Sequence, residues 1–398
     1  MTTPSNRLYF LDWIRILAFL LLIVYHVGMY YVSWDWIVKS PHANDAIEPL
    51  MMLSSPWRLG LLFLVSGVAS SFMLAKMSAG RFVRMRSARL LVPLLFAMLV
   101  IVPFQPYFEV IEKVGYKGSY LDFMRLYVTG YGGFCRATDC LLLPTWNHLW
   151  FVAYLAAYTL VFGAIVRLLG ARFDALARRC GQCLAGWRVI VLPAAVFGLL
   201  RLSLQPYFET THALVDDWYN NAHYFTLFIL GAFMARVPAV WARFSQVRWQ
   251  ALGVALTCWG VMVVYYSLPE ASLSHPELGY ALMRLVYALC AWCAIVAICG
   301  FACLRLNWDH PARAWLTQAV FPVYIFHQSL IVSMAHLMKP ATLHPAVEAL
   351  VLIVLTLCIS FGLFEMVRRV AILRPLFGID RDRIATSPPQ RAADGLAA

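Results

Sequence analysis

Long apolar segments alternate with short polar segments along most of this chain of 398 residues. A helix needs about 20 apolar residues to cross the hydrocarbon core of a bilayer, and most of these segments reach that length. The pattern therefore predicts an all-α integral membrane protein with about ten transmembrane helices. The expected spans are 10–33, 58–78, 90–108, 147–169, 188–204, 222–237, 249–267, 280–303, 317–338 and 347–371. The two shortest, 188–204 and 222–237, are the least clearly bounded.

Composition agrees with a membrane protein. The chain is 62% hydrophobic and 13% charged, with a mean hydropathy of +0.71, which excludes an ordinary soluble domain of this length. No small-residue cleavage site follows the first apolar run, so we expect the first span to be retained. We expect one membrane domain over residues 1–378, and a disordered cytoplasmic tail over 379–398, which contains the low-complexity run Ser-Pro-Pro-Gln-Arg-Ala-Ala-Asp.

Basic residues set the expected orientation. About two thirds of the 32 Lys and Arg residues fall on the side that would hold both termini. The positive-inside rule then places both termini in the cytoplasm. This topology, together with anionic lipid, accounts for the net charge of +12, so nucleic acid is not needed as a partner.

Three ionisable residues share one face of the first predicted helix. His26 follows Arg15 by eleven residues, a spacing that returns both side chains to one face within roughly 20° and about 16 Å apart along the axis. Asp12 lies one turn before Arg15 on the same face. Ionisable groups at membrane depth are costly and usually mark function. This stripe indicates an enzyme that works inside a membrane.

Other polar residues stand at defined depths in the predicted helices. Arg58 lies at the outer mouth of the second span, and Ser66 and Gly67 lie within it. His148 opens the fourth span from the outside, and His327 lies within the ninth. A basic cluster at the inner face consists of Arg81, Arg84, Arg86 and Arg89.

These residues carry a resemblance to the membrane acyltransferase-3 family, and it extends from residue 7 to about residue 378. Within that family the chain most resembles the glucan-succinyltransferase branch, through its Tyr-Phe-Leu-Asp opening and its basic, Pro-containing run at 368–377. The family features appear in the expected order: Leu11-Asp12-x2-Arg15-x10-His26, Phe63-x-x-Ser66-Gly67 before an Arg-rich inner loop with Pro93, His148-Leu-Trp-Phe151, and Tyr324-x-x-His327.

The resemblance implies transfer of an acyl group, acetyl or succinyl, from cytoplasmic acyl-CoA to a hydroxyl of a periplasmic or cell-surface glycan. It also implies a location in the bacterial inner membrane. The expected partners are acyl-CoA as donor substrate, the glycan acceptor and the lipid bilayer, with no tightly bound cofactor and no metal. The expected catalytic residues are His26, Arg15, Asp12, Ser66, Arg58, His148 and His327.

The residue types suit this chemistry. A histidine is well matched to removing a hydroxyl proton near neutral pH, and we expect His26 to be that base. A donor or cation must stabilise the developing oxyanion, a role open to Arg58, Ser66 or His148. The phosphates of CoA require cations. The expected binding residues are Arg81, Arg84, Arg86 and Arg89, together with Arg15.

Simpler readings of the same residues stay open. His26, His148 and His327 are also compatible with structural hydrogen bonds between helices, and Ser66-Gly67 with close helix packing. The basic cluster is also what topology alone would require. A polytopic transporter or flippase for a glycan or its precursor is the alternative function, although no inverted repeat is visible. A non-catalytic partner of a glycan export machine is a third possibility.

The cysteines add little. Cys135 and Cys140 lie in a predicted outer loop, where a disulfide between them is possible if the compartment is oxidising. Cys180 and Cys183 lack the second pair that a zinc site would need. Oligomeric state is not indicated.

Overall fold

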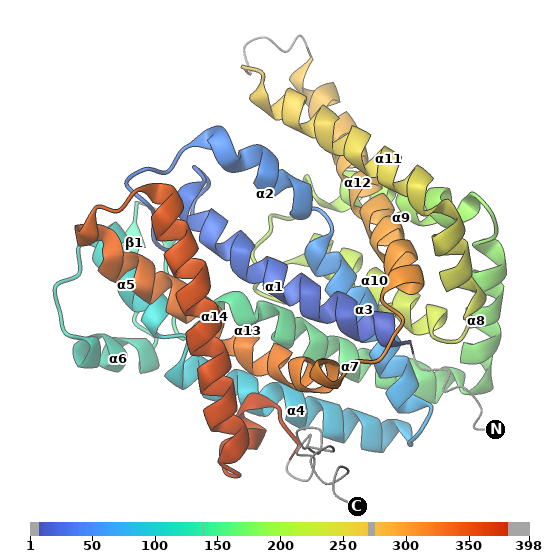
Figure 1. Cartoon of the computed structure of the whole chain (residues 1–398), viewed down its shortest axis with the longest axis horizontal. Helices are drawn as coiled ribbons and strands as arrows, with labels where there is room; N and C mark the ends of the chain where they lie inside the picture. Colours follow the sequence, from blue (N-terminus) through green and yellow to red (C-terminus); the bar gives the residue numbers. More distant parts are fainter. Residues whose placement is uncertain (1–7, 138, 270–274, 381–398) are drawn as a thin grey trace, which may run out of the picture.

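The computed structural model describes residues 8–137, 139–269 and 275–380 of the chain, and within these residues the protein is almost entirely helical (Figure 1). The expected all-α membrane fold is confirmed. The α-helices are α1 Tyr9–Tyr31, α2 Glu48–Ser54, α3 Arg58–Leu74, α4 Ala79–Val100, α5 Phe104–Val114, α6 Tyr120–Val128, α7 Trp150–Leu169, α8 Ala171–Cys183, α9 Arg188–Leu204, α10 Trp218–Met234, α11 Ala239–Ser267, α12 Pro276–Arg305, α13 Pro311–Met338 and α14 Pro345–Arg369. The only described strands are β1 Cys135–Arg136 and β2 Asp139–Cys140, which form a short antiparallel hairpin.

The number of membrane spans is lower than the ten expected. Among the described residues, seven helices are long and apolar enough to cross a membrane, or nine if each of two bent pairs is one span. The bent pairs are α4 with α5, at 42°, and α8 with α9, at 109°. The expected span at 222–237 corresponds to α10, which has 17 residues and would extend only about 26 Å. A helix therefore exists at each predicted span, but α10 is too short to be included among the candidate membrane spans.

Two segments expected as polar connections are helical. The basic cluster 81–89 lies in the first turns of α4, which begins at Ala79 because the Ser78 hydroxyl accepts a hydrogen bond from the Arg81 N–H as an N-cap. Residues 171–183 form α8. Both segments contain many charged residues, so apolar runs alone did not mark them as helical. The prediction of an Arg-rich loop was therefore wrong.

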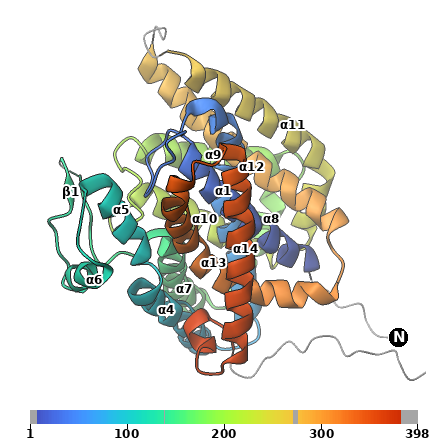
Figure 2. The same ribbon diagram turned by 60° about the vertical axis from the view of Figure 1, so that its left-hand side comes forward.

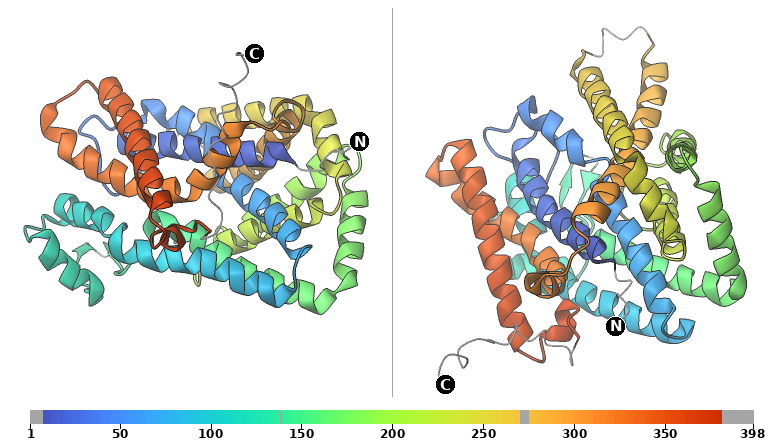
Figure 3. Two further views of the ribbon diagram at one scale, coloured as in Figure 1. Left: turned by 60° about the horizontal axis from the view of Figure 1, so that its bottom comes forward. Right: turned by 45° about the vertical axis from the view of Figure 1, so that its right-hand side comes forward.

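Helix α1 passes through the middle of the bundle, whereas α14 lies on its periphery (Figures 1 and 3). Helices α11 and α12 pack along each other as a hairpin that projects from one side. Helices α3 and α10 approach most closely at two glycines. A Cβ atom added at Gly67 would lie 1.9 Å from the Phe228 carbonyl oxygen, and one added at Gly231 would lie 2.0 Å from the Leu64 carbonyl oxygen. Glycine is therefore required on both sides of this crossing.

Ion pairs between distant segments fall into two groups at opposite ends of the helices. Each group joins only segments that the expected topology puts on one side of the membrane. At the basic end the pairs are Asp12–Arg313, Arg89–Asp380 and Asp174–Arg236. At the other end they are Asp35–Lys113, Glu112–Lys339 and Glu112–His336. The alternation of the helices is thus consistent with the expected topology, and the cytoplasmic assignment of the basic end stays a prediction from charge.

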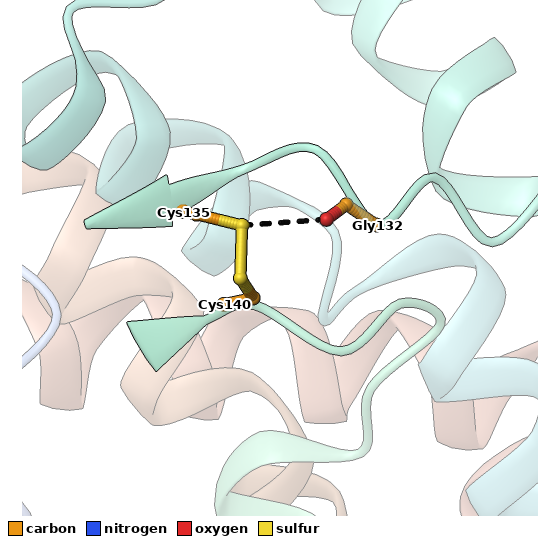
Figure 4. Close-up of a disulfide and its surroundings, with 3 residues drawn as sticks. All are labelled: Gly132, Cys135 and Cys140. Carbon is orange, nitrogen blue, oxygen red and sulfur yellow. Dashed lines mark hydrogen bonds between the residues drawn. A yellow bond between two sulfur atoms is a disulfide. The ribbon is translucent and has the colours of Figure 1, made fainter. Parts of the chain in front are cut away.

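Helices α5 and α6 and the β hairpin form a lobe at one edge of the molecule (Figure 2). The hairpin is closed by a disulfide between Cys135 and Cys140, and the Cys135 Sγ lies 3.4 Å from the Gly132 carbonyl oxygen (Figure 4). The pairing left open from the sequence is therefore present. The expected tail at 379–398 falls, from residue 381 on, outside the described residues, and the domain boundary at 378 stays a prediction.

Candidate active site

A cavity of about 450 Å³ lies at the ends of α1, α3 and α7 that are opposite the basic end, beside the middle of α13 and the segments that follow α1 and precede α7 and α10. After the expected topology, we call this end of the helices outer and the basic end inner. The size of the cavity is within the range of small-molecule sites, about 300–1,000 Å³. Three of the predicted site residues line it: His26, Arg58 and His148. The rest of its polar and aromatic lining includes Tyr25, Asp35, Trp36, Thr145, Trp146, Asn147, Trp150, Thr211, His212, Tyr324 and Gln328.

Two of the predicted histidines form a direct pair. The Nδ1 atom of His26 lies 2.8 Å from the Nε2 atom of His327, and the two rings stack with their planes 11° apart. The Nδ1 atom of His327 lies 2.6 Å from the Tyr324 carbonyl oxygen. His327 is almost fully buried, with 1% of its surface exposed. The packing of α1 against α13 thus fixes the ring of His26 through the ring of His327.

These contacts determine which nitrogen of His26 is available. A carbonyl oxygen only accepts hydrogen bonds, so the His327 Nδ1 must carry a hydrogen and donate it to Tyr324. A neutral His327 then accepts at Nε2, and the His26 Nδ1–H donates to it. The lone pair of His26 therefore lies on Nε2, the nitrogen that the pair does not use. A histidine oriented in this way by a third group has the geometry of a general base.

His148 is held in a different way. Its Nε2–H points at the carbonyl oxygens of Tyr324 and Ile325, each 3.2 Å away, so its Nδ1 accepts from the Gln105 amide at 3.0 Å. The Tyr324 hydroxyl donates in return to the His148 carbonyl oxygen. Both ring nitrogens of His148 are thus engaged. This histidine is suited to positioning the start of α7 against α13, and it has no free lone pair for proton abstraction.

Arg58 has donors without partners. Its guanidinium lies over the Tyr25 ring, with the Cζ atom 3.2 Å from the ring centroid, and the side chain is buried. The Nε and Nη1 atoms have no hydrogen-bond partner among the described residues. A buried cation with unmet donors is costly, and such a group normally awaits an anionic or carbonyl ligand. Arg58 and His26 line the same cavity, and the two side chains interact electrostatically.

The predicted basic cluster divides into two parts. Arg86 and Arg89 interact electrostatically with Arg15, so these three cations gather at the inner ends of α1 and α4. Arg86 also donates from Nε to the Thr159 hydroxyl at 3.2 Å. Arg81 and Arg84 are exposed on α4 and, among the described residues, show no such interaction with Arg15, whereas Arg89, which is also exposed, pairs with Asp380 at 3.4 Å. The candidate phosphate site is therefore Arg15, which lies on the same helix α1 as His26 but about 16 Å from it, together with Arg86 and Arg89 of α4.

Asp12 forms an ion pair that the sequence did not suggest. Its Oδ2 lies 2.5 Å from Nη1 of Arg313, a residue that is 5% exposed at the start of α13. Asp309 holds the same guanidinium through Nε at 2.7 Å. Asp12 does interact electrostatically with Arg15, but its hydrogen-bonded partner is Arg313. This arrangement fastens the inner ends of α1 and α13 to each other.

Ser66 is not among the residues that line the cavity. It stands eight residues after Arg58 on α3, about 12 Å deeper along the helix. Its neighbour Gly67 makes the close contact with α10 described above. The geometry of the Ser-Gly pair thus favours helix packing, which was the simpler of the two readings.

Sequence reasoning missed a network of amides beneath the histidines. Gln105 is fully buried on α5 and donates to the Ser329 hydroxyl at 2.8 Å, while its own Oε1 accepts from Gln328 at 3.0 Å. Ser329 donates to the Ile101 carbonyl oxygen at 2.7 Å. Only the position of Gln328, directly after His327, offered a signal in the sequence. The network ties the bend between α4 and α5 to the middle of α13.

Comparisons with known proteins agree with these features. The family model of the acyltransferase domain Acyl_transf_3 matches residues 8–365. The chain is 22% identical over 396 residues to glucans biosynthesis protein C of Salmonella paratyphi B, and 23% identical over 385 residues to that of Salmonella heidelberg. Each match covers 94% of this chain and 96% of the relative. No solved structure matches.

The match to the family covers His26, Arg58, His148 and His327 as well as the inner cations. Because the matching domain is an acyltransferase domain, the match favours an enzyme over the transporter and the non-catalytic partner left open above. The chain is a multi-pass membrane enzyme that belongs to the acyltransferase-3 family.

Proposed function

We propose that this enzyme moves an acyl group from cytoplasmic acyl-CoA to a hydroxyl of a glycan on the outer side of a bacterial inner membrane. The observation that carries the proposal is that His26, which is paired with His327, and Arg58, a buried cation with unpartnered donors, line one cavity. The three inner cations, which lie on α1 and α4 at the opposite end of α1 from His26, support an anionic donor on that side. The relatives named for glucan biosynthesis support a glycan as acceptor.

The proposed reaction is direct transfer. His26 takes the hydroxyl proton on Nε2 while the hydroxyl oxygen attacks the thioester carbonyl carbon. The resulting oxyanion accepts hydrogen bonds from the free donors of Arg58. Collapse of the intermediate breaks the carbon–sulfur bond, and the departing thiolate takes the proton back from His26. His327 positions His26 and accepts the Nδ1–H throughout, which stabilises the imidazolium.

The donor is expected to bind from the inner side. Arg15, Arg86 and Arg89 would hold the phosphates of CoA, and the long, thin acyl-pantetheine arm would extend toward His26. Phe19 lies on the same face of α1, between Arg15 and His26, and its ring contacts that of Tyr324 with centroids 5.3 Å apart. These two aromatic side chains must separate for the arm to pass.

The test is transfer of radiolabelled acyl groups by the purified enzyme in proteoliposomes. Labelled acetyl-CoA and succinyl-CoA would each be offered with a glucan acceptor, and label would be measured in the glucan fraction. We expect label in the glucan and release of free CoA in equal amounts. CoA binding without transfer from either donor would refute the proposal.

The proposed orientation is tested by cysteine labelling. In a cysteine-free background, single cysteines at positions 117 and 210 should react with an impermeant reagent in intact cells, and one at position 175 only after permeabilisation. The reason is the charge asymmetry between the two ends of the bundle. Reaction of position 175 in intact cells would reverse the orientation, and with it the assignment of donor and acceptor sides.

A further inference from the structure

A second cavity adjoins the one that contains His26. It measures about 470 Å³ and lies between α5, the disulfide-closed β hairpin and the segments before α7 and α10. The two cavities share five lining residues: Asp35, Thr145, Trp146, Thr211 and His212. We refer to the second cavity as the vestibule. Because these five residues line both cavities, the vestibule lies directly beside the cavity that contains His26.

Hydrogen bonds hold the residues that separate the two cavities in place. The indole N–H of Trp146 donates to the His212 carbonyl oxygen at 2.9 Å. The backbone N–H of Thr145 donates to the hydroxyl of Tyr127 at 3.2 Å, and that hydroxyl donates to the Met98 carbonyl oxygen at 2.7 Å. An aromatic side chain held by its polar edge presents a fixed apolar face to a ligand.

The vestibule combines apolar and charged side chains, and its charges are balanced. Lys113 bridges Asp35 at 3.2 Å and Glu109 at 3.0 Å, and Arg136 adds a second cation to the lining. Two carboxylates thus face two cations, so the vestibule has no net attraction for an anion or a cation. It offers hydrogen-bond donors and acceptors beside aromatic rings instead. A neutral ligand with many hydroxyl groups suits this combination.

We infer that the vestibule is a distal subsite for the acceptor, and that the acceptor is a neutral oligosaccharide of at least two linked sugars. One sugar presents its hydroxyl to His26, and the chain continues past Trp146 into the vestibule. This inference rests on the proposed function. It goes further by excluding a single free sugar as the preferred acceptor, since a monosaccharide would leave the second cavity empty.

The inference is tested by comparing a short and a long acceptor. The probes are methyl glucoside and a linear glucose hexasaccharide, with radiolabelled acyl-CoA as donor. We expect the wild-type enzyme to show a KM for the hexasaccharide that is at least tenfold lower. Equal KM values for the two acceptors would overturn the inference. Absence of transfer to both would instead refute the proposed function.

Two variants locate the effect in the vestibule. Leu142 is 81% exposed and lines only the vestibule, so Leu142→Trp should fill that cavity without disturbing the core. The matched control is Leu121→Trp on α6, at a leucine that is 72% exposed and lines neither cavity. We expect Leu142→Trp to raise the KM for the hexasaccharide about tenfold and to leave methyl glucoside kinetics unchanged. An equal effect on both acceptors, or the same effect in the control, would overturn the inference.

A second substitution tests the polar contacts. The double variant Glu109→Gln with Arg136→Gln removes one charge of each sign and leaves the charge balance of the vestibule unchanged. We expect the KM for the hexasaccharide to rise several-fold with no change in kcat. A matching rise for methyl glucoside would contradict a distal site.

Discussion

The two ends of helix α1 differ in whether a ligand cavity is already formed beside them. At the outer end His26 borders an open cavity, and its neighbours His148 and His327 are already locked by hydrogen bonds. At the inner end Arg15 belongs to a group of three cations that lines neither outer cavity. There Arg86 packs against Thr159 and Met73.

This difference suggests how the reaction is divided. A preformed site holds reacting groups in place without further reorganisation, which favours catalysis. A cationic site that borders no described cavity attracts phosphate but must rearrange to admit the rest of the donor. We therefore expect the outer half to provide the chemistry and the inner half to provide affinity for the donor. Substitutions in the outer half should therefore lower the rate of acyl transfer, and substitutions in the inner half should weaken acyl-CoA binding.

The largest effect is expected at His26. His26→Ala should fold and reach the membrane, yet lose acyl transfer by about 10²-fold or more, because the lone pair on the His26 Nε2 is the proposed acceptor of the hydroxyl proton. His26→Gln should not restore activity, since an amide does not take up the proton. The control is His42→Ala, at an exposed histidine outside both cavities. Activity within a few-fold of wild type in either His26 variant would reduce this residue to a packing role.

Arg58 should come next. Arg58→Ala is expected to lower acyl transfer by about 10²-fold, the usual cost of removing one oxyanion donor, while acyl-CoA binding stays nearly intact. Lys117→Ala removes an exposed positive charge from the same side and is the matched control. His148→Ala should also impair transfer more than donor binding, but less strongly, because His148 positions rather than reacts. Loss of donor binding in Arg58→Ala would place the donor phosphates at the outer end.

Helical periodicity explains which parts of this site were predictable. Arg15 and His26 share a face because both lie in one regular helix, and apolar length located that helix. The partner of His26 is 301 residues away in the chain, so the pairing depends on how α1 packs against α13. No periodic pattern within one segment encodes that packing. The same reason hid Arg313 as the partner of Asp12.

The fold was predictable to a similar extent. Apolar runs marked every span, but they do not record where a helix extends into charged sequence, as α4 does through Arg81. They also do not reveal cavities, because these arise where helix ends and loops from several segments meet. The vestibule is lined by residues of α5, the β hairpin and two loops, so no single sequence motif predicts it.

The inner cations should change binding more than chemistry. Arg15→Ala and Arg86→Ala are each expected to weaken acyl-CoA binding about tenfold, with an effect that shrinks at high salt as screening removes the phosphate attraction. The paired variant Arg81→Ala with Arg84→Ala is the control, since both side chains are exposed on the same helix α4. Equal losses in the control would show that general positive charge matters, and not the group around Arg15.

The smallest effect on activity is expected at Ser66, which separates packing from chemistry within one motif. Ser66→Ala should leave transfer nearly unchanged, because the residue lies outside the cavity. Gly67→Ala forces a Cβ against the Phe228 carbonyl oxygen and should destabilise the protein by about 1–3 kcal/mol or more. The measurements are transfer rate per folded molecule and the melting temperature in detergent. A strong loss of rate in Ser66→Ala, at unchanged melting temperature, would return Ser66 to the catalytic group and extend the reacting region toward the inner half.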